Sequence, residues 1–278
     1  MNLIQAIILG IVQGVTEFAP VSSSAHLVLV PWAFGWPNPG VAFDTLLHWG
    51  TLTAVIIYFW HEWVRVVKGF FRSLTTRGPW NSRPGGRLAD DDNRLAWWII
   101  IGTIPAMVLG LALKDFFESL FASPVSVGGL LLITALILTL GERFGRRERD
   151  LNRMTLVDTL LIGLAQAAAI APGISRSGAT IATGLLRGLK RDDAARFSFL
   201  LGTPIILGAG LMQVPGLVEA GGFAQELPVL IAGFLAAAIA GYLCIKYLLR
   251  YLRHGSLYIF AAYCAAIGIA TLILGAIR

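Results

Sequence analysis

Two apolar stretches, each interrupted by a polar break, decide the fold. Residues 2–30 read NLIQAIILGIVQGVTEFAPVSSSAHLVLV, and residues 155–186 read TLVDTLLIGLAQAAAIAPGISRSGATIATGLL. At about 30 residues, each is too long for one bilayer crossing and too short for two crossings and a turn. Each also contains a proline followed by serines, at Pro20 and Pro172. We therefore expect two re-entrant helical hairpins, each of which enters the membrane and returns to the same side.

The rest of the chain has the composition of a membrane protein. Hydrophobic residues make up 56% of it and charged residues only 14%, too few charges to cover a soluble surface. Six further apolar segments have the length of a bilayer crossing. The expected fold is an all-α polytopic membrane protein in one domain, 1–278, with two opposed hairpins and six transmembrane helices, at 41–61, 95–113, 125–142, 197–214, 228–248 and 256–277.

The basic residues set the expected topology. Lys and Arg cluster at 65–94, 143–153, 187–196 and 246–253, which places these segments inside by the positive-inside rule. The second hairpin lies between two internal segments and so enters from inside, whereas the first enters from outside. The net charge of +6 therefore reflects topology and does not indicate a nucleic-acid partner. The start of the chain lacks the basic region of a signal peptide, so we expect it to be retained.

A weak internal repeat relates the two hairpins. Leu9–Gln13 resembles Ile162–Gln166, and the first serine of the break lies nine positions after the glutamine in both copies. We expect an inverted repeat of residues 2–142 and 155–277, with a flexible internal loop at 72–94. Inverted repeats with broken helices commonly form a binding site at the midplane. A likeness between Gly102–Pro105 and Gly202–Pro204 is taken as chance.

Few charged residues are expected deep in the membrane, where they are costly and usually functional. Glu17 lies in the first break and Arg176 in the second. Asp44 and Asp158 lie near segment ends, and we expect interfacial water to solvate them. Three further histidines look interfacial and are assigned no chemistry: His48, His61 and His254.

The first break combines groups for cation and anion binding. Gln13 and Glu17 are four residues apart and share a helix face, which suits a hard cation. Pro20 ends that helix, and a serine of Ser22–Ser24 can cap the next one, so that its first N–H groups form an anion site. His26 follows on the first turn, close enough to exchange protons with a bound group.

The second break adds a positive charge. Arg176 offers a planar fork that matches phosphate or carboxylate oxygens. Two helix N-termini and an arginine favour a multiply charged anion such as a diphosphate. Structural explanations stay open here: an ion pair that only holds the hairpins together, serines that only cap helices, and a His26 that only packs. The neighbouring glycines and hydroxyls expected to contribute are Gly173, Ser175, Ser177 and Gly178.

The residues 13–26 and 172–180 resemble the undecaprenyl-diphosphate phosphatase family, also called bacitracin-resistance proteins, and the likeness runs through the whole chain. The resemblance implies hydrolysis of the lipid diphosphate to the monophosphate and inorganic phosphate, which recycles the carrier for peptidoglycan synthesis. It also implies a divalent cation (Mg or Ca), the bacterial cytoplasmic membrane, and an active site that faces outside.

Carried over by position, the resemblance makes Glu17, Ser23, His26 and Arg176 catalytic. Glu17 and Gln13 would bind the cation, although many members have Glu where this chain has Gln13. Ala25 stands where Gly is common. The nucleophile stays open between Ser23 and water. The residues expected to bind the diphosphate are Ser22, Ser24, Gly173, Ser175, Ser177, Gly178 and Thr180.

The main alternative is a transporter or flippase for an anionic polyprenyl phosphate lipid, since opposed broken helices also suit alternating access. Glu17 and His26 favour hydrolysis, because an anion carrier gains nothing from an acid in its site. A second family of membrane phosphatases is excluded because Ala182 stands where its chemistry requires a histidine. The expected partners are the lipid substrate and membrane lipids, with a possible homodimer.

Overall fold

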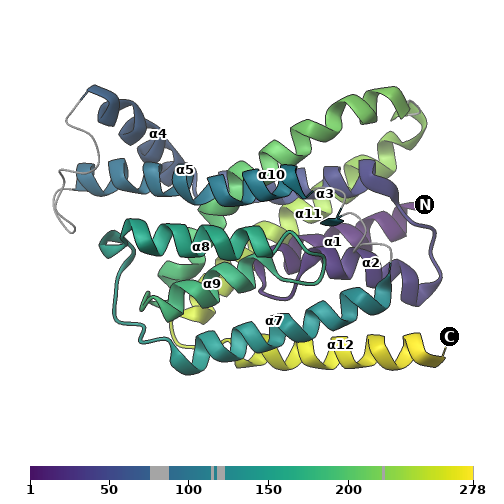
Figure 1. The fold of residues 1–278 in the computed structure, drawn as a ribbon. Coiled ribbons are helices and arrows are strands. Elements are labelled where there is room, and N and C mark those ends of the chain that lie inside the picture. The colour runs from purple at the N-terminus through teal and green to yellow at the C-terminus, as the bar shows by residue number, and fades with distance from the viewer. Residues whose placement is uncertain (76–87, 114–115, 118–122, 221–222, 278) are drawn as a thin grey trace.

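The computed structural model describes residues 1–75, 88–113, 116–117, 123–220 and 223–277. These residues form an all-helical bundle with no strand beyond one isolated bridge (Figure 1). The described helices are α1 (Leu3–Phe18), α2 (Ser23–Phe34), α3 (Gly40–Tyr58), α4 (Trp60–Thr75), α5 (Leu88–Ala112), α7 (Pro124–Phe144), the 3-10 helix η2 (Leu151–Arg153), α8 (Leu156–Ala168), α9 (Arg176–Leu186), α10 (Arg191–Ala220), α11 (Phe223–Leu252) and α12 (Tyr258–Ile277).

Six of the described helices are long and apolar enough to cross a membrane, which confirms the predicted number of spans. They match the predicted segments in order. Helix α10 begins at Arg191, ahead of its predicted start at 197, because its first turn is charged and hydropathy therefore does not include it. The spans are Gly40–Tyr58, Asp91–Ala112, Pro124–Phe144, Arg191–Val214, Leu227–Leu252 and Tyr258–Ile277. The chain is therefore a multi-pass membrane protein.

The two interrupted stretches each form a pair of shorter helices, α1 with α2 and α8 with α9. Helix α1 ends at Phe18 ahead of Pro20, and Ser22 takes a left-handed conformation (φ 70°) as the N-cap of α2. The second break turns at Gly173 (φ 107°), and Ser175 is the N-cap of α9. Proline cannot donate the next helical hydrogen bond, so α1 ends near Pro20, as the sequence predicts. Helix α8 ends at Ala168, four residues ahead of Pro172.

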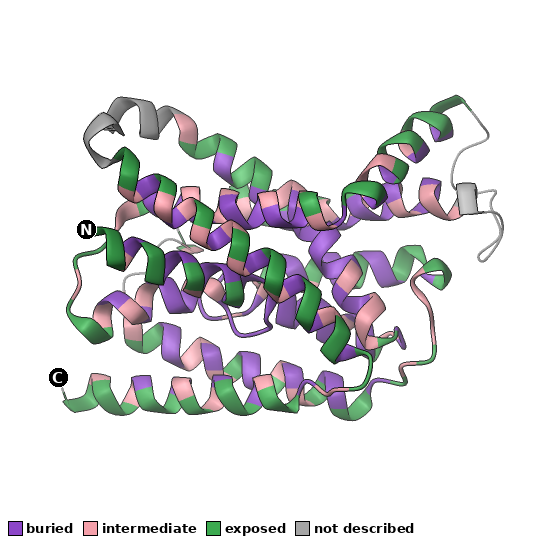
Figure 2. Ribbon diagram, turned by 180° about the vertical axis from the view of Figure 1, so that it is seen from behind, coloured by how far each residue is buried: buried purple, intermediate pink, exposed green. Residues whose placement is uncertain are grey.

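Small residues let the helices of each broken pair approach the long spans closely. A Cβ added at Gly10 of α1 would lie 2.5 Å from the Gly233 carbonyl oxygen of α11, and one at Gly163 of α8 would lie 2.5 Å from that of Gly102 in α5. Close packing of this kind drives helix association where lipid removes the hydrophobic effect. Buried residues gather where the helices meet, while much of the outer surface is exposed (Figure 2); that surface carries many large apolar side chains.

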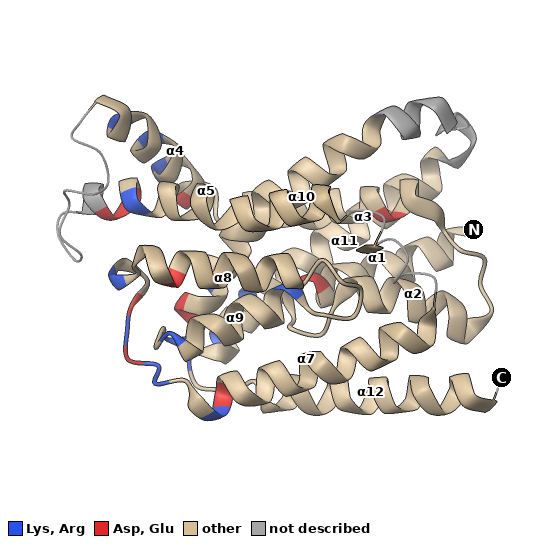
Figure 3. Ribbon diagram, in the orientation of Figure 1, with Lys and Arg blue, Asp and Glu red and all other residues tan. Residues whose placement is uncertain are grey.

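The charges gather at one end of the bundle, around α4, the start of α5 and the chain between α7 and α8 (Figure 3). The expected loop at 72–94 is shorter than predicted, because α4 continues to Thr75 and α5 begins at Leu88. Arg72 donates to Asn93 Oδ1 and ties these two helix ends together. The remainder of that loop, residues 76–87, lies outside the described residues.

Candidate functional site

Glu17 and Arg176 meet where the two breaks come together. Arg176 Nη2 lies 2.7 Å from Glu17 Oε1, and the glutamate is only 7% exposed. Arg176 Nη1 donates to the carbonyl oxygen of Gly202 on α10 at 3.0 Å. The proximity that the sequence predicts between the two deep charges is confirmed, although they lie 159 residues apart.

The second carboxylate oxygen of Glu17 is held by its own hairpin. Gln13 Nε2 donates to Glu17 Oε2 at 2.9 Å, as the spacing of four residues predicts. Ser23 Oγ donates to the same oxygen at 2.5 Å. The amide oxygen of Gln13 is buried and has no hydrogen-bond partner among the described residues. The cluster therefore presents a fully bonded carboxylate beside an amide oxygen that is still able to bind a ligand.

The three serines of the first break have different surroundings. Ser22 caps α2, because its Oγ accepts from Ala25 N at 3.4 Å. Its hydroxyl also lies 3.2 Å from that of Ser24. Ser23 is the serine whose hydroxyl reaches Glu17. The positive-φ turn at Ser22 thus separates a capping serine from a serine that faces the acid.

The second break joins the first through Ser177, whose Oγ donates to the Ala19 carbonyl oxygen at 3.3 Å. Ser175 Oγ accepts from Gly178 N at 3.0 Å and lies 3.2 Å from Ser177 Oγ. These residues lie next to the ion pair, as expected.

The other two residues expected to bind substrate have protein partners. Gly173 accepts from Thr134 Oγ1 of α7 at 2.7 Å. The hydroxyl of Thr180 lies 2.6 Å from Ser198 Oγ on α10. Both positions therefore support the walls of the site, since their polar groups bind neighbouring helices.

His26 is buried behind the first break. Its Nδ1 lies 2.8 Å from the Ser22 carbonyl oxygen, which can only accept, so Nδ1 carries a proton. In the neutral ring Nε2 then accepts from the hydroxyl of Tyr263 on α12, at 2.8 Å. Both ring nitrogens are therefore engaged with groups other than Glu17.

His48, to which the sequence analysis assigned no chemistry, lies beside Glu17. Its Nε2 lies 3.8 Å from Glu17 Oε2, and its Nδ1 lies 2.8 Å from the Asp44 carbonyl oxygen. Helix α3 carries it into the bundle one turn beyond Asp44. Gly202 was also missed, because only its carbonyl oxygen contacts Arg176.

Asp158 was expected at an interface where water would solvate it, and this expectation is wrong. Its side chain is fully buried and forms 2.7 Å ion pairs with Arg149 and Arg187. Glu142, 3% exposed, is likewise paired with Arg147 and Arg191. Arginines from the loops neutralise these acids, which explains how they can be buried away from the Glu17–Arg176 site.

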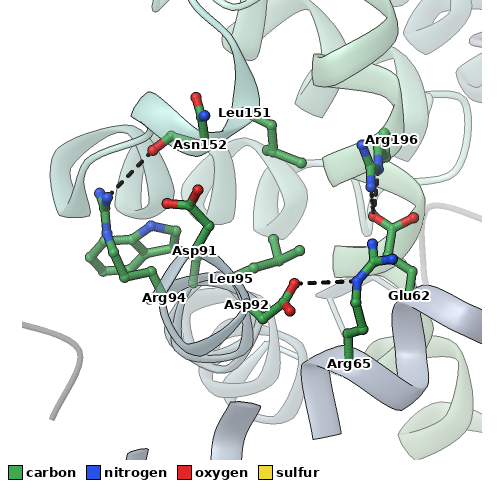
Figure 4. Close-up of a pocket in the computed structure, with 10 residues that line it drawn as sticks. Glu62, Arg65, Asp91, Asp92, Arg94, Leu95, Leu151, Asn152 and Arg196 are labelled. Atoms are coloured by element: carbon green, nitrogen blue, oxygen red, sulfur yellow. Dashed lines mark hydrogen bonds and ion pairs between the residues drawn. The ribbon is translucent and has the colours of Figure 1, made fainter. Parts of the chain in front are cut away.

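A cavity of about 280 Å³ lies at the charged end and holds none of the expected site residues (Figure 4). Arg65 pairs with Asp92 at 3.4 Å, and Arg196 pairs with Glu62. These pairs connect α4 to α5 and α10. These two ion pairs at the cavity thus hold neighbouring helices together.

The whole chain has known relatives. The family described as bacitracin resistance protein BacA matches residues 6–270. A protein named undecaprenyl-diphosphatase from Thermomicrobium roseum is 45% identical over 280 residues, 98% of each chain. Proteins of the same name from Desulforudis audaxviator (43% over 282 residues, 100% of each chain) and Myxococcus xanthus (42% over 274 residues, 99% of this chain and 89% of the relative) are also similar.

Proposed function

The chain belongs to the family of bacitracin resistance protein BacA, and from that premise we propose how it acts as an undecaprenyl diphosphatase. The proposal is that Arg176 binds the diphosphate and that Glu17 and Ser23 carry the reaction. The single observation that supports it most is the Glu17–Arg176 pair at the meeting point of the two breaks. Hydrolysis recycles the lipid carrier for peptidoglycan synthesis, and bacitracin resistance follows from the family.

Substrate binding begins with displacement of the ion pair. The Glu17 carboxylate sits on the guanidinium of Arg176 in the position that a phosphate oxygen would take. The N-termini of α2 and α9 lie beside it, and their backbone N–H groups favour an anion. Arg176 Nη1 stays bonded to the carbonyl oxygen of Gly202. Nη2 can then exchange the Glu17 carboxylate for a phosphate oxygen.

Ser23 is the nucleophile that the geometry favours. Its hydroxyl already donates to Glu17, so Glu17 can take the proton as Ser23 Oγ bonds to the terminal phosphorus. The bridging P–O bond breaks and undecaprenyl phosphate leaves. Water then hydrolyses the phosphoserine and releases inorganic phosphate. Direct attack by water, with Glu17 as the base, remains the alternative.

His26 contributes to this chemistry through the position of the first break. Its bonds to Ser22 and Tyr263 hold the first turn of α2 in place. We assign it to positioning of the break, and no step requires it to carry a proton.

The residues of the first break fit a divalent cation such as Mg or Ca. The carboxylate of Glu17 and the buried amide oxygen of Gln13 are the hard ligands that these ions prefer. When bound, the ion would neutralise charge on the diphosphate. Among the described residues no group of three or more His, Cys, Asp or Glu gathers, so phosphate oxygens of the substrate would have to complete the shell, as is usual for Mg²⁺.

The two broken pairs act as opposed re-entrant hairpins in an inverted repeat, 2–142 and 155–277. In support, α1 packs on α11 while α8 packs on α5 through glycines at matching positions, Gly10 and Gly163. The site would face the outside of the bacterial cytoplasmic membrane, opposite the end where the charges gather (Figure 3). A homodimer belongs to the same proposal.

Phosphate release from undecaprenyl diphosphate by the purified protein in detergent tests the proposal. Detergent abolishes any gradient, so a pure transporter or flippase would release no phosphate. We expect turnover by the wild type and its loss in Arg176→Ala, with Arg65→Ala as a control from the other end of the bundle. Turnover in Arg176→Ala close to that of the wild type would contradict the assigned role.

A further inference from the structure

His48 is a partly exposed histidine that lies outside both sequence blocks of the site. It belongs to α3 and lies 31 positions after Glu17 along the chain. Its Nε2 nevertheless points to Glu17 Oε2, the oxygen that faces away from Arg176. The chemistry proposed above for the two breaks gives this imidazole no role.

The hydrogen bonding of His48 fixes which of its nitrogens is available. Nδ1 lies 2.8 Å from the carbonyl oxygen of Asp44, so Nδ1 carries the proton. In the neutral ring Nε2 then carries a lone pair. This lone pair faces a carboxylate oxygen, and two electron-rich atoms that face each other attract a cation between them.

The distance between the two atoms fits an ion. At 3.8 Å, His48 Nε2 and Glu17 Oε2 are too far apart for a direct hydrogen bond. Two ligands bound at about 2.1 Å to one ion lie up to about 4.2 Å apart. Glu17 Oε2 already accepts from Gln13 Nε2 and Ser23 Oγ, so the ion would take the place of the Gln13 donor. A half-turn of the Gln13 amide would free Oε2 and bring the unbonded amide oxygen to the same ion.

We propose that His48 Nε2 is a ligand of the divalent cation, together with Glu17 and Gln13. This inference rests on the cation of the proposed function and adds a nitrogen to its ligands. An imidazole ligand favours Mn²⁺ and later first-row ions over Ca²⁺, which prefers oxygen. The site would therefore bind Mn²⁺ more tightly than Ca²⁺.

Electron spin-echo envelope modulation of bound Mn²⁺ tests the proposal directly, because it detects a coordinated nitrogen. The full-length protein in detergent is loaded with Mn²⁺ and methylenediphosphonate, a diphosphate that cannot be hydrolysed. We expect ¹⁴N modulation in the wild type, its loss in His48→Gln, and Mn²⁺ binding weakened at least about 10-fold. His61→Gln, which changes an exposed histidine, serves as the control and keeps both signals.

Two further samples keep the test decisive if His48→Gln does not fold. Wild type labelled with ¹⁵N-histidine shows whether the nitrogen comes from a histidine, and His26→Gln distinguishes His48 from the buried His26. Modulation that is absent, or that is lost only in His26→Gln, would overturn the assignment to His48 while phosphate release stays intact. Failure to bind Mn²⁺ at all would overturn both this inference and the cation of the proposed function.

Discussion

The two breaks share a local structure and differ in chemistry. In both, a glutamine precedes the N-capping serine by nine residues: Gln13 with Ser22, and Gln166 with Ser175. At matching positions, however, Glu17 corresponds to Ile170, Ser23 to Arg176 and His26 to Ala179. The first break supplies an acid and a hydroxyl, and the second supplies a guanidinium. In the proposed function, one local structure thus serves two roles, with catalysis at the first break and anion binding at the second.

The largest effect is expected at the acid that only the first break has. Glu17→Gln keeps the shape of the side chain but removes the base and the charge that orients Arg176. We expect kcat for phosphate release to fall about 1,000-fold. Ile170→Val is the control, because it alters the matching position of the second break without removing a polar group. A Glu17→Gln enzyme with nearly full turnover would mean that the two breaks do not divide the chemistry in this way.

Neighbouring serines of the first break sharpen the comparison. Ser23 donates to Glu17, whereas Ser24 lies beside Ser22. We expect Ser23→Ala to lower turnover about 100-fold, because the nucleophile is lost and only direct attack by water remains, and Ser24→Ala to lower it only a few fold. The measurement is single-turnover phosphate release, and equal effects of the two substitutions would refute the assignment to Ser23.

A smaller effect tests the anchor of the second break. A Cβ at position 202 would overlap the guanidinium of Arg176, whereas one at Gly102 meets the movable end of the Leu201 side chain and the methyl group of Thr159. We expect Gly202→Ala to reduce kcat/KM about 10-fold by displacing Arg176. Gly102→Ala is the matched control, since it changes packing and leaves Arg176 in place. Similar kcat/KM values for the two variants would show that the anchor has no influence on binding.

The smallest effect concerns the two glutamines. Gln13 binds Glu17, but neither amide atom of buried Gln166 has a hydrogen-bond partner in the part of the chain that the structure describes. Gln166→Leu removes an unsatisfied polar group at similar volume, so we expect a gain of about 1 kcal/mol in stability. Thermal unfolding in detergent measures it, with Gln13→Leu as the counterpart that loses activity. A clear loss of stability in Gln166→Leu would show that its amide is in use.

The sequence predicts the parts of this molecule that depend on local patterns. Apolar runs of span length give the six spans, and Pro20 and Pro172 give the breaks. The Glu17–Arg176 pair was also predictable, because each break contains a single charged residue and a buried charge needs a partner.

The remaining features depend on partners that are distant in the chain. Nothing local distinguishes a histidine such as His48 from one at the membrane interface. The burial of Asp158 depends on arginines from two separate loops, and the orientation of His26 depends on Tyr263, 237 residues later.

The resting ion pair has a consequence for selectivity among lipids of the same membrane. Because Arg176 is already paired with Glu17, an incoming headgroup would have to compete with a carboxylate of the same chain, which is present at high local concentration. A headgroup with two phosphates can displace it, whereas one with a single phosphate competes poorly. On the proposed mechanism, undecaprenyl phosphate, the product, is therefore expected to inhibit the enzyme only weakly.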